Sequence, residues 1–468
     1  MPEFLLNSLA DIAAALRSGK TTATALAEEA NANNARRGPT LDAYKTRNPA
    51  QFLAEARVAD AAFAAGLDFG PLQGIPVSVK DLYGVSGYPT FAGTPAALSD
   101  QWTTEGPVVE ALRRSLATIS GKTHTVEFAF GGLGTNAHWG TPRNPWDAEA
   151  HRAPGGSSAG AGVSLCEGSA VIALGSDTAG SVRVPASFTG AVGVKTSFRR
   201  WSVDGVVPLS PSLDTTGILA RTVSDAILAF AAIDPVTAVP PAVLLAGLSE
   251  LDVSDTRIGL CTRHFADCSP GVAEGVQAAL DELAAAGAQI VDVDLPEVME
   301  AEEIFIRGGL AAPEFAAFIN NVMSARKATL DPNVAGRFAS MEAITAIEYL
   351  KRRDRLVYLA AAIDDCLADI DVLVGPTAPI TPPRLTEIAT PEDYRAHNMP
   401  ALRNTQTANL LSLSAVTMPV ALDDAGMPVG LQIMAPLNED ERALAVALAF
   451  ERTLGTCRER LGTPPLCR

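Results

Sequence analysis

Apolar residues, mainly alanine and leucine, recur at helical spacing through residues 1–70. This spacing places them on one face of each helix, which is then buried against a neighbour. Residues suited to begin helices precede the runs: Ser8, Thr21 or Thr22, and Asn48 with Pro49. The pattern predicts an N-terminal group of helices, over 9–16, after residue 22, and from 49 to about 65.

From Gly74 onward the pattern changes to short β-branched runs between glycine-rich turns. Four such runs predict strands: PVSVK, ATISGKT, AVIALGS and AVGVKTS. In the first, Val77 and Val79 share one face, while Ser78 and Lys80 share the other. Lys80 therefore leaves the sheet near a strand end, which is where ligands usually bind in open α/β sheets.

The second half of the chain again mixes strands and helices. Thr222 with Asp225 resembles a capping box for a helix that runs to Ile233. The further elements expected are a strand over 257–261, a helix through 276–283, a strand over 289–295, a helical region over about 300–368, a strand over 371–374 and a pair of strands within VTMPVALDDAGMPVGLQIM. Asn438 with Glu441 is expected to cap a final helix.

Because strands come from both halves, we expect an α/β fold with one twisted, mixed β-sheet covered by helices on both faces. The chain then forms a single domain over 1–468. Within it we distinguish N-terminal helices (1–70), a core that carries the chemistry (74–235), and a second part of the same sheet with helices that line the substrate site (236–468).

Composition places the chain among globular proteins, with 47% hydrophobic and 19% charged residues. The formal net charge of −17 argues against broad binding to nucleic acid or to an anionic membrane. The six cysteines are widely spaced without a CxxC pair, so we expect reduced thiols and no metal site. The N-terminal residues do not resemble a signal peptide, which favours a cytoplasmic location.

Three residues in glycine-rich or strand-like surroundings suggest hydrolytic chemistry: Lys80 in GIPVSVKDLYG, Ser157 in APGGSSAG and Ser181 in GSDTAGSVRVPAS. A serine at its ordinary pKa needs a nearby base to act as a nucleophile. No G-x-S-x-G elbow accompanies the histidines, and nothing in the sequence pairs one with a serine. His124 and His138 are interpreted as loop residues without partners.

These motifs together resemble the amidase signature family. The likeness is densest from Gly74 to Ser197 and returns in DVLVGPTAP and MPVGLQIMAP. Two positions depart from the family pattern, Ala159 and Ala179, where glycine is common. Each departure adds one methyl group, which affects substrate fit more than chemistry.

The resemblance implies an acyl-enzyme mechanism without metal or organic cofactor. Ser181 would be the nucleophile, and Ser157, after a cis Gly156–Ser157 peptide bond, would connect it to Lys80 as the base. Lys80 must be uncharged for this role, which requires burial. We expect an oxyanion hole from the backbone N–H groups of Thr178, Ala179, Gly180 and Ser181. Asp177, Arg183 and Gly156 are expected to support the site, with Glu127 and Asn144 as hydrogen-bonding scaffold around it.

The substrate is expected to be a small molecule. An apolar pocket is predicted from Phe91, Phe128, Phe130, Gly131, Gly132, Phe305 and Phe315. It favours neutral aryl or alkyl amides, with carbamates, hydrazides or esters as related substrates. Arg307 and Arg337 leave a carboxylate-bearing substrate open, provided that either points inward.

Three alternatives stay open at this point. The chain also resembles the glutaminase component of a tRNA-dependent amidotransferase, although no Arg/Asp pair suited to a glutamine head group is evident. It also resembles allophanate hydrolases, and a binding protein without catalysis is a third alternative. We expect no nucleic-acid or membrane partner, and a homodimer is compatible with the sequence.

Overall fold

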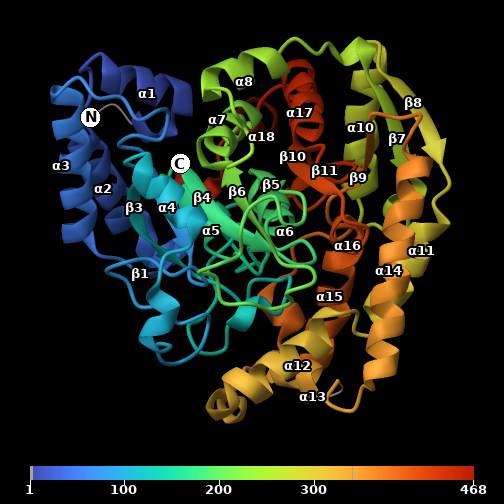
Figure 1. Ribbon diagram of the computed structural model, residues 1–468. Coiled ribbons are helices and arrows are strands. Elements are labelled where there is room, and N and C mark those ends of the chain that lie inside the picture. Colours follow the sequence, from blue (N-terminus) through green and yellow to red (C-terminus); the bar gives the residue numbers. More distant parts are fainter. Residues whose placement is uncertain (1–3, 340) are drawn as a thin grey trace.

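A single mixed sheet crosses the molecule in the computed structural model, which describes residues 4–339 and 341–468. The sheet has 11 strands in the order β1-β3-β2-β4-β6-β5-β10-β11-β9-β7-β8. Figure 1 shows the N-terminal helices at the β1 end of this sheet and β7 and β8 at the other end. The expectation of one mixed sheet built by both halves is confirmed. The three-part division at residues 70 and 235 stays a prediction.

The strands form two parallel groups that flank an antiparallel centre. Their bounds are β1 Tyr44–Thr46, β2 Pro76–Lys80, β3 Thr118–Thr123, β4 Ile172–Asp177, β5 Val192–Lys195, β6 Thr215–Ala220, β7 Arg257–Cys261, β8 Gln289–Val293, β9 Val372–Pro376, β10 Ser414–Leu422 and β11 Pro428–Ala435. Strands β3, β2 and β4 are parallel, as are β8, β7 and β9. The four strands between these groups pair antiparallel. Strands β2 and β4 therefore end at the same edge of the sheet.

Helices cover both faces of the sheet. Their bounds are α1 Leu9–Arg17, α2 Ala23–Leu41, α3 Pro49–Ala64, α4 Pro107–Arg114, α5 Ala161–Glu167, α6 Arg183–Thr189, α7 Val223–Ile233, α8 Pro241–Leu248, α9 Thr262–Phe265, α10 Val272–Ala285, α11 Pro296–Ile306, α12 Ala311–Val322, α13 Pro332–Ala339, α14 Ala346–Cys366, α15 Pro391–Arg403, α16 Gln406–Leu410, α17 Asp440–Leu454 and α18 Cys457–Leu461. Helices α7, α10 and α17 pack together over the central strands, while α5 and α6 pack against each other and the sheet. The largest apolar core lies between the sheet and α7, α10 and α17, and it extends to the N-terminal helices. A smaller apolar cluster joins α5 and α6 to the sheet.

The predicted N-caps of the first helices and of α7 are confirmed. The side chains of Ser8, Thr22, Asn48 and Thr222 each accept a hydrogen bond from the backbone N–H three residues ahead. Each bond satisfies one of the N–H groups that a helix start leaves without an intrahelical partner.

The predicted cap of the last long helix is wrong. Asn438 lies outside α17 with φ of 67°, and Glu439 is the N-cap residue without a side-chain cap. Instead the Asn438 N–H donates to Ser197 Oγ, and Asp440 Oδ1 accepts from Ser197 N–H. A tertiary contact with residue 197 thus replaces the local cap.

The structure also contains elements that the sequence pattern did not predict. Strands β1 and β6 were missed, and the expected helical region over 300–368 is divided into α11, α12, α13 and α14. Gly308 and Gly309, both with positive φ, separate α11 from α12. Within the described ranges, none of the helices combines the length and apolar character that crossing a bilayer requires.

Candidate active site

Lys80 is the last residue of β2, and its amine lies at the edge where β4 also ends. Its Nζ is 2.7 Å from Ser157 Oγ and 2.9 Å from Ser176 Oγ. Lys80 and Ser157 are fully buried, and Ser181 is 4% exposed. The three residues singled out from the sequence therefore lie in the closed interior.

Burial changes the protonation of Lys80. Desolvation lowers the pKa of its amine to about 7, although the carboxylates of Asp177 and Asp214 oppose this shift. A substantial fraction of Lys80 is uncharged near neutral pH as a result. An uncharged amine that contacts a serine hydroxyl can accept its proton.

Backbone contacts place Ser157 beside Ser181. The Gly156–Ser157 peptide bond is cis, and Gly156 N–H donates to Gly132 O at 2.8 Å. The next residue, Ser158, donates from its hydroxyl to Ser181 O at 2.6 Å. The two serine-bearing segments are thereby joined directly. None of the hydrogen bonds among the described residues connects Ser181 Oγ with Ser157, so of the expected contacts among these three side chains only that between Lys80 and Ser157 is formed.

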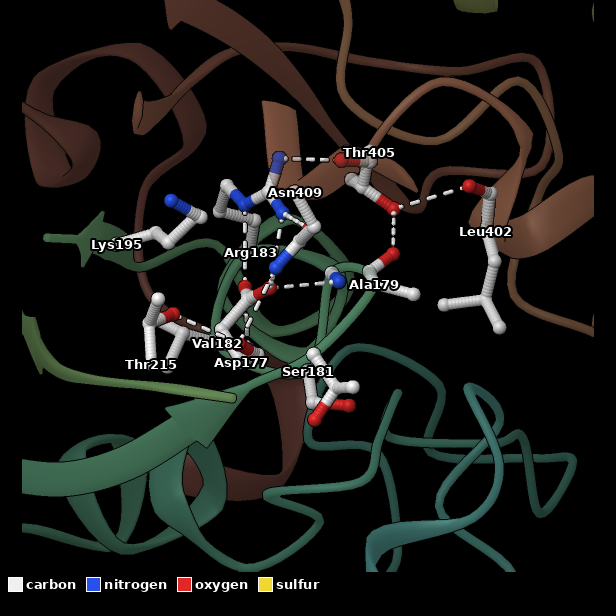
Figure 2. Close-up of polar contacts among 12 residues, drawn as sticks. Asp177, Ala179, Ser181, Val182, Arg183, Lys195, Thr215, Leu402, Thr405 and Asn409 are labelled. Atoms are coloured by element: carbon white, nitrogen blue, oxygen red, sulfur yellow. Dashed lines mark hydrogen bonds and ion pairs between the residues drawn. The ribbon is translucent and has the colours of Figure 1, made fainter. Parts of the chain in front are cut away.

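A buried ion pair holds the turn that carries Ser181, between β4 and α6 (Figure 2). Arg183 binds both carboxylate oxygens of Asp177, at 2.9 and 3.1 Å. It also donates to Thr405 O, Gln432 Oε1 and Asn409 Oδ1. Burial opposes ionisation of Asp177, but the adjacent Arg183 holds the pKa of this carboxyl well below its ordinary value.

The Asp177 carboxylate also determines which backbone amides remain for a substrate. Gly180 N–H donates to Asp177 Oδ1 at 2.7 Å, and Val182 N–H donates to Oδ2 at 3.0 Å. The Gly180 N–H is therefore already used to fix the turn, and its expected role as an oxyanion donor stays a prediction. Thr178, Ala179 and Ser181 remain as candidate donors.

Gly180 has a different role in the turn. Its φ is +130°, and a Cβ there would lie 2.1 Å from Thr405 Oγ1. Thr405 Oγ1 donates to Ala179 O at 2.7 Å, as Figure 2 shows. Only glycine allows Thr405 to approach this closely.

A cavity of about 110 Å³ adjoins Ser176 and Thr178. Its other lining residues are largely apolar: Leu82, Ala129, Val203, Val206, Val207, Pro208, Leu209, Pro211, Asp214 and Thr215. Burial raises the pKa of Asp214 to about 6, and its carboxylate accepts from Thr178 Oγ1 at 2.6 Å. A larger cavity, of about 520 Å³, lies elsewhere. Neither cavity is lined by Lys80, Ser157 or Ser181, but the smaller one reaches Ser176, whose hydroxyl contacts Lys80.

The structure brings together only some of the residues predicted to line the substrate pocket. Phe128, Phe130 and Phe315 pack against one another beside Ala129, in an apolar cluster behind the cavity. Phe305 packs against other apolar clusters, and Phe91 contacts Trp139. Gly132 contacts Gly156 through its carbonyl oxygen.

Arg307 and Arg337, the two arginines considered as partners for a substrate carboxylate, differ in exposure and packing. The Arg307 side chain is 67% exposed and lies 3.6 Å from Glu303, so it points to solvent. The Arg337 guanidinium lies over the Phe130 ring, 5.0 Å from its centroid. Of the two, only Arg337 contacts a residue predicted to line the substrate pocket.

Both histidines that were expected to lack partners have them. His138 Nε2 lies 3.2 Å from Glu127 Oε1, and His124 packs edge-on against Trp139 and lies 3.5 Å from Asp42. Glu127 also accepts from Asp331 N–H, and burial raises its pKa to about 8. Asn144 bonds only backbone groups, including Ala153 O and Phe188 O.

Several residues of the site were not predicted: Ser158, Ser176, Thr405, Asn409 and Gln432. Ser158 and Ser176 lie inside the motifs that carry Ser157 and Ser181, so their position in those motifs was the available signal. The other three come from 405–432 and meet Arg183 only in the folded chain. Across residues 4–339 and 341–468 there is no cluster of side chains suited to holding a metal ion, and the six cysteines are free thiols.

Comparison with known proteins is consistent with this geometry. A family model described as Amidase matches residues 25–444. A 2-amino-5-chloromuconic acid deaminase of Comamonas testosteroni is 50% identical over 460 residues, 98% of this chain and 98% of that protein. A glutamyl-tRNA(Gln) amidotransferase component of Synechococcus sp. (strain RCC307) is 31% identical over 480 residues, 96% of this chain and 98% of that protein. The solved structure of native peptide amidase from Stenotrophomonas maltophilia matches with a TM-score of 0.80 and 27% identity, covering 98% of each chain.

Proposed function

The chain belongs to the amidase family, whose members hydrolyse amide C–N bonds, and we propose that it does so with Ser181 as nucleophile, Ser157 as proton relay and Lys80 as base. The observation that carries the proposal is the buried 2.7 Å contact between Lys80 Nζ and Ser157 Oγ. Outside a catalytic role, burying a lysine next to a hydroxyl costs free energy without an ion pair in return.

The proposed reaction has two halves. Ser181 Oγ bonds to the carbonyl carbon as its proton passes through Ser157 to Lys80. The C–N bond then breaks, and the same proton leaves with the amine or ammonia. Water repeats the sequence on the acyl-enzyme and releases the acid. The contact between Ser181 and Ser157 forms when substrate is bound, since catalytic hydrogen bonds often tighten only then.

Charge on the tetrahedral oxygen is proposed to be held by N–H groups of the Thr178–Ser181 turn, without that of Gly180. The buried Asp177–Arg183 pair fixes this turn before substrate arrives. Donors that are already in position need no reorganisation during reaction, which is why such groups contribute strongly to rate. Loss of one donor typically costs about 3 kcal/mol of transition-state stabilisation.

Two substrate classes have support. The apolar walls of the cavity favour a hydrocarbon acyl group, as in a neutral amide. The relative at 50% identity, named for 2-amino-5-chloromuconic acid, favours a small acid that loses its nitrogen as ammonia. The nitrogen of such an acid is on a carbon that is not a carbonyl carbon, so the acyl-enzyme steps described above apply to the amide class alone. Identity to the amidotransferase component is lower, at 31%, so a glutaminase that needs partner chains is the weaker candidate.

Covalent labelling tests the assignment. A fluorophosphonate should modify Ser181, as read by peptide mass spectrometry, and Ser181→Ala should abolish both labelling and ammonia release from amides. Ser86→Ala, at an exposed position, is the matched control and should behave as wild type. Ammonia release by Ser181→Ala at the wild-type rate would exclude the proposed nucleophile.

A further inference from the structure

The cavity of about 520 Å³ brings together residues from widely separated parts of the chain. Residues 6–8 line it together with residues of α2, α5 and α6, the start of α7, and several residues within 456–468. Its volume lies in the range of about 300–1,000 Å³ that is common for small-molecule sites. None of the three proposed catalytic side chains lines it, so it is separate from the candidate active site.

Helices α5 and α6 connect the candidate active site with this cavity. Ser157 lies shortly before the first turn of α5, and Ser181 lies shortly before the first turn of α6. Towards the other ends of these helices, Leu165 and Cys166 of α5 and Thr189 of α6 line the cavity. A ligand in the cavity would therefore contact both helices at the ends opposite the two serines.

Arginines dominate the charged lining of the cavity. Five arginines and one aspartate contribute to it: Arg36, Arg37, Arg221, Arg458, Arg468 and Asp225. The chain as a whole has a formal net charge of −17, so this group of cations contrasts with the rest of the molecule. A concave surface lined mainly by one sign of charge attracts small molecules of the opposite sign.

Arg221, directly after β6, is the half-buried cation of this group. Its Nη2 donates to Asn7 O at 3.0 Å and its Nη1 to Ala170 O at 3.3 Å. Both partners are neutral carbonyl groups, which hold the guanidinium in place without balancing its charge. Burial lowers the pKa of Arg221, whereas a bound anion would stabilise the charged form.

Asp225, the one aspartate of the lining, already has a structural role. Its Oδ1 accepts from the Leu9 N–H at 2.7 Å, which fixes the start of α1. Burial raises the pKa of Asp225, so its carboxyl opposes an anion less than an exposed carboxylate would. The balance of charge in the cavity therefore still favours an anion.

The lining near these charges is largely apolar. Trp146 Nε1 donates to Thr189 O at 2.8 Å, Cys166 Sγ donates to Thr189 O at 3.4 Å, and Cys457 Sγ donates to Gly190 O at 2.6 Å. Because their polar hydrogens are already bonded to the backbone, these side chains offer a ligand apolar surface. Together with Leu165 they suit an aromatic ring or a hydrocarbon chain.

We propose that this cavity is a second ligand site, which binds a small organic anion with an aromatic or hydrocarbon body. The anionic group would accept hydrogen bonds from Arg221 and from the exposed Arg458, while the apolar body would lie against Trp146 and Leu165. Arg37 donates to Glu167 O and Cys467 O, so it is assigned only a contribution of charge.

Isothermal titration with 2-naphthoate, an aromatic carboxylate, tests the charge recognition. Arg221→Gln should weaken 2-naphthoate binding about 10- to 100-fold, the range for hydrogen bonds to charged groups, and should change binding of the neutral 2-naphthalenemethanol less than about twofold. Arg458→Gln, at an exposed position where folding is not at risk, should also weaken 2-naphthoate binding. Arg353→Gln makes the same charge change at an exposed position outside the cavity and should have no effect.

A variant that fills the cavity tests the location of the site. Thr463 is half-buried and lines the cavity, so Thr463→Trp should weaken binding of both naphthalene compounds about 10-fold or more. Thr103→Trp makes the same change at a half-buried position outside the cavity and should leave both affinities unchanged.

Three results would overturn the proposed anion site: no measurable binding of 2-naphthoate, equal affinity of the wild type and both arginine variants for it, or binding that Thr463→Trp does not change. None of these measurements uses turnover. The outcome is therefore independent of the proposed function, whose failure would appear as ammonia release by Ser181→Ala.

Discussion

Lys80 shows how the chemistry of one residue depends on its surroundings. A lysine at a strand end is usually a solvated cation, with an ordinary pKa of about 10.4. Here the end of β2 is covered completely, so burial lowers the pKa to about 7. The nearby carboxylates of Asp177 and Asp214 keep it from falling further. Burial and these charges together give the amine a pKa close to neutral pH, which is the value that suits a general base.

The pH dependence of activity follows from this value. Only the uncharged form of Lys80 accepts a proton, so kcat/KM should rise as pH increases through about 7 and become level above it. Lys80→Met should lower kcat by roughly 10²- to 10⁴-fold and remove this acid limb. Steady-state rates of the wild type and the variant between pH 5 and 9 measure the change in kcat and the acid limb. Circular dichroism confirms that the variant is folded. An unchanged acid limb in Lys80→Met would assign it to another group.

At the residue level the sequence could single out Lys80, Ser157 and Ser181 as candidates, because their flanking motifs are local, and the structure brings Lys80 and Ser157 into contact. It could not predict the use of Gly180 N–H by Asp177, because that depends on how the turn closes. It also could not separate Arg307 from Arg337. Both lie in helical sequence, and only the folded structure shows that Arg337 packs on the Phe130 ring while Arg307 is exposed.

At the level of elements, the site forms where backbone segments approach each other so closely that a side chain larger than glycine does not fit between them. The segment 130–132 lies between α15 and the Gly156–Ser157 bond. A Cβ at Gly131 would meet Tyr394 Oη, and a Cβ at Gly132 would meet Leu402 at 2.8 Å. Neither glycine has a positive φ, so the close approach of α15 explains both. Hydrophobic periodicity in the sequence predicts that helices form, but it cannot predict which residues of two elements come into contact.

Gly131→Ala tests this packing. The added methyl should destabilise the fold by about 1–3 kcal/mol through overpacking. Tyr394→Phe removes the clashing oxygen, so the double variant should recover most of the loss, as a positive coupling in a double-mutant cycle. Thermal unfolding of the four proteins measures the coupling.

Gly247 of α8 provides the control, because nothing lies within 4 Å of a Cβ added there. Gly247→Ala should be neutral or stabilising by up to about 1 kcal/mol. Additive effects of Gly131→Ala and Tyr394→Phe would contradict the contact.

At the scale of the whole molecule, the two halves of the chain share one sheet. Strand β5 of the first half pairs with β6 on one side and with β10 of the second half on the other. Arg200 adds a second connection, since it binds Asp234 after α7 and Asp440 and Glu441 of α17. Alternating strands and helices from both halves were enough to predict a shared sheet. The same pattern could not predict the order of the strands in the sheet, because that order depends on pairing between distant parts of the chain.

Arg200→Met tests whether this shared architecture unfolds as a unit. Removing the buried guanidinium leaves the carboxylates of Asp234 and Asp440 without their cationic partner, which should cost about 3–5 kcal/mol. Because β5 still pairs with β10, the variant should unfold in one urea transition with the same midpoint by tryptophan fluorescence and by far-UV circular dichroism.

Arg114→Met is the control. Arg114 lies in an exposed pair with Glu110 at 3.7 Å, so this variant should change the free energy of unfolding by less than about 1 kcal/mol. Two separate transitions in Arg200→Met would mean that the halves are joined mainly by this ion-pair cluster, and that the continuous sheet alone does not make them cooperative.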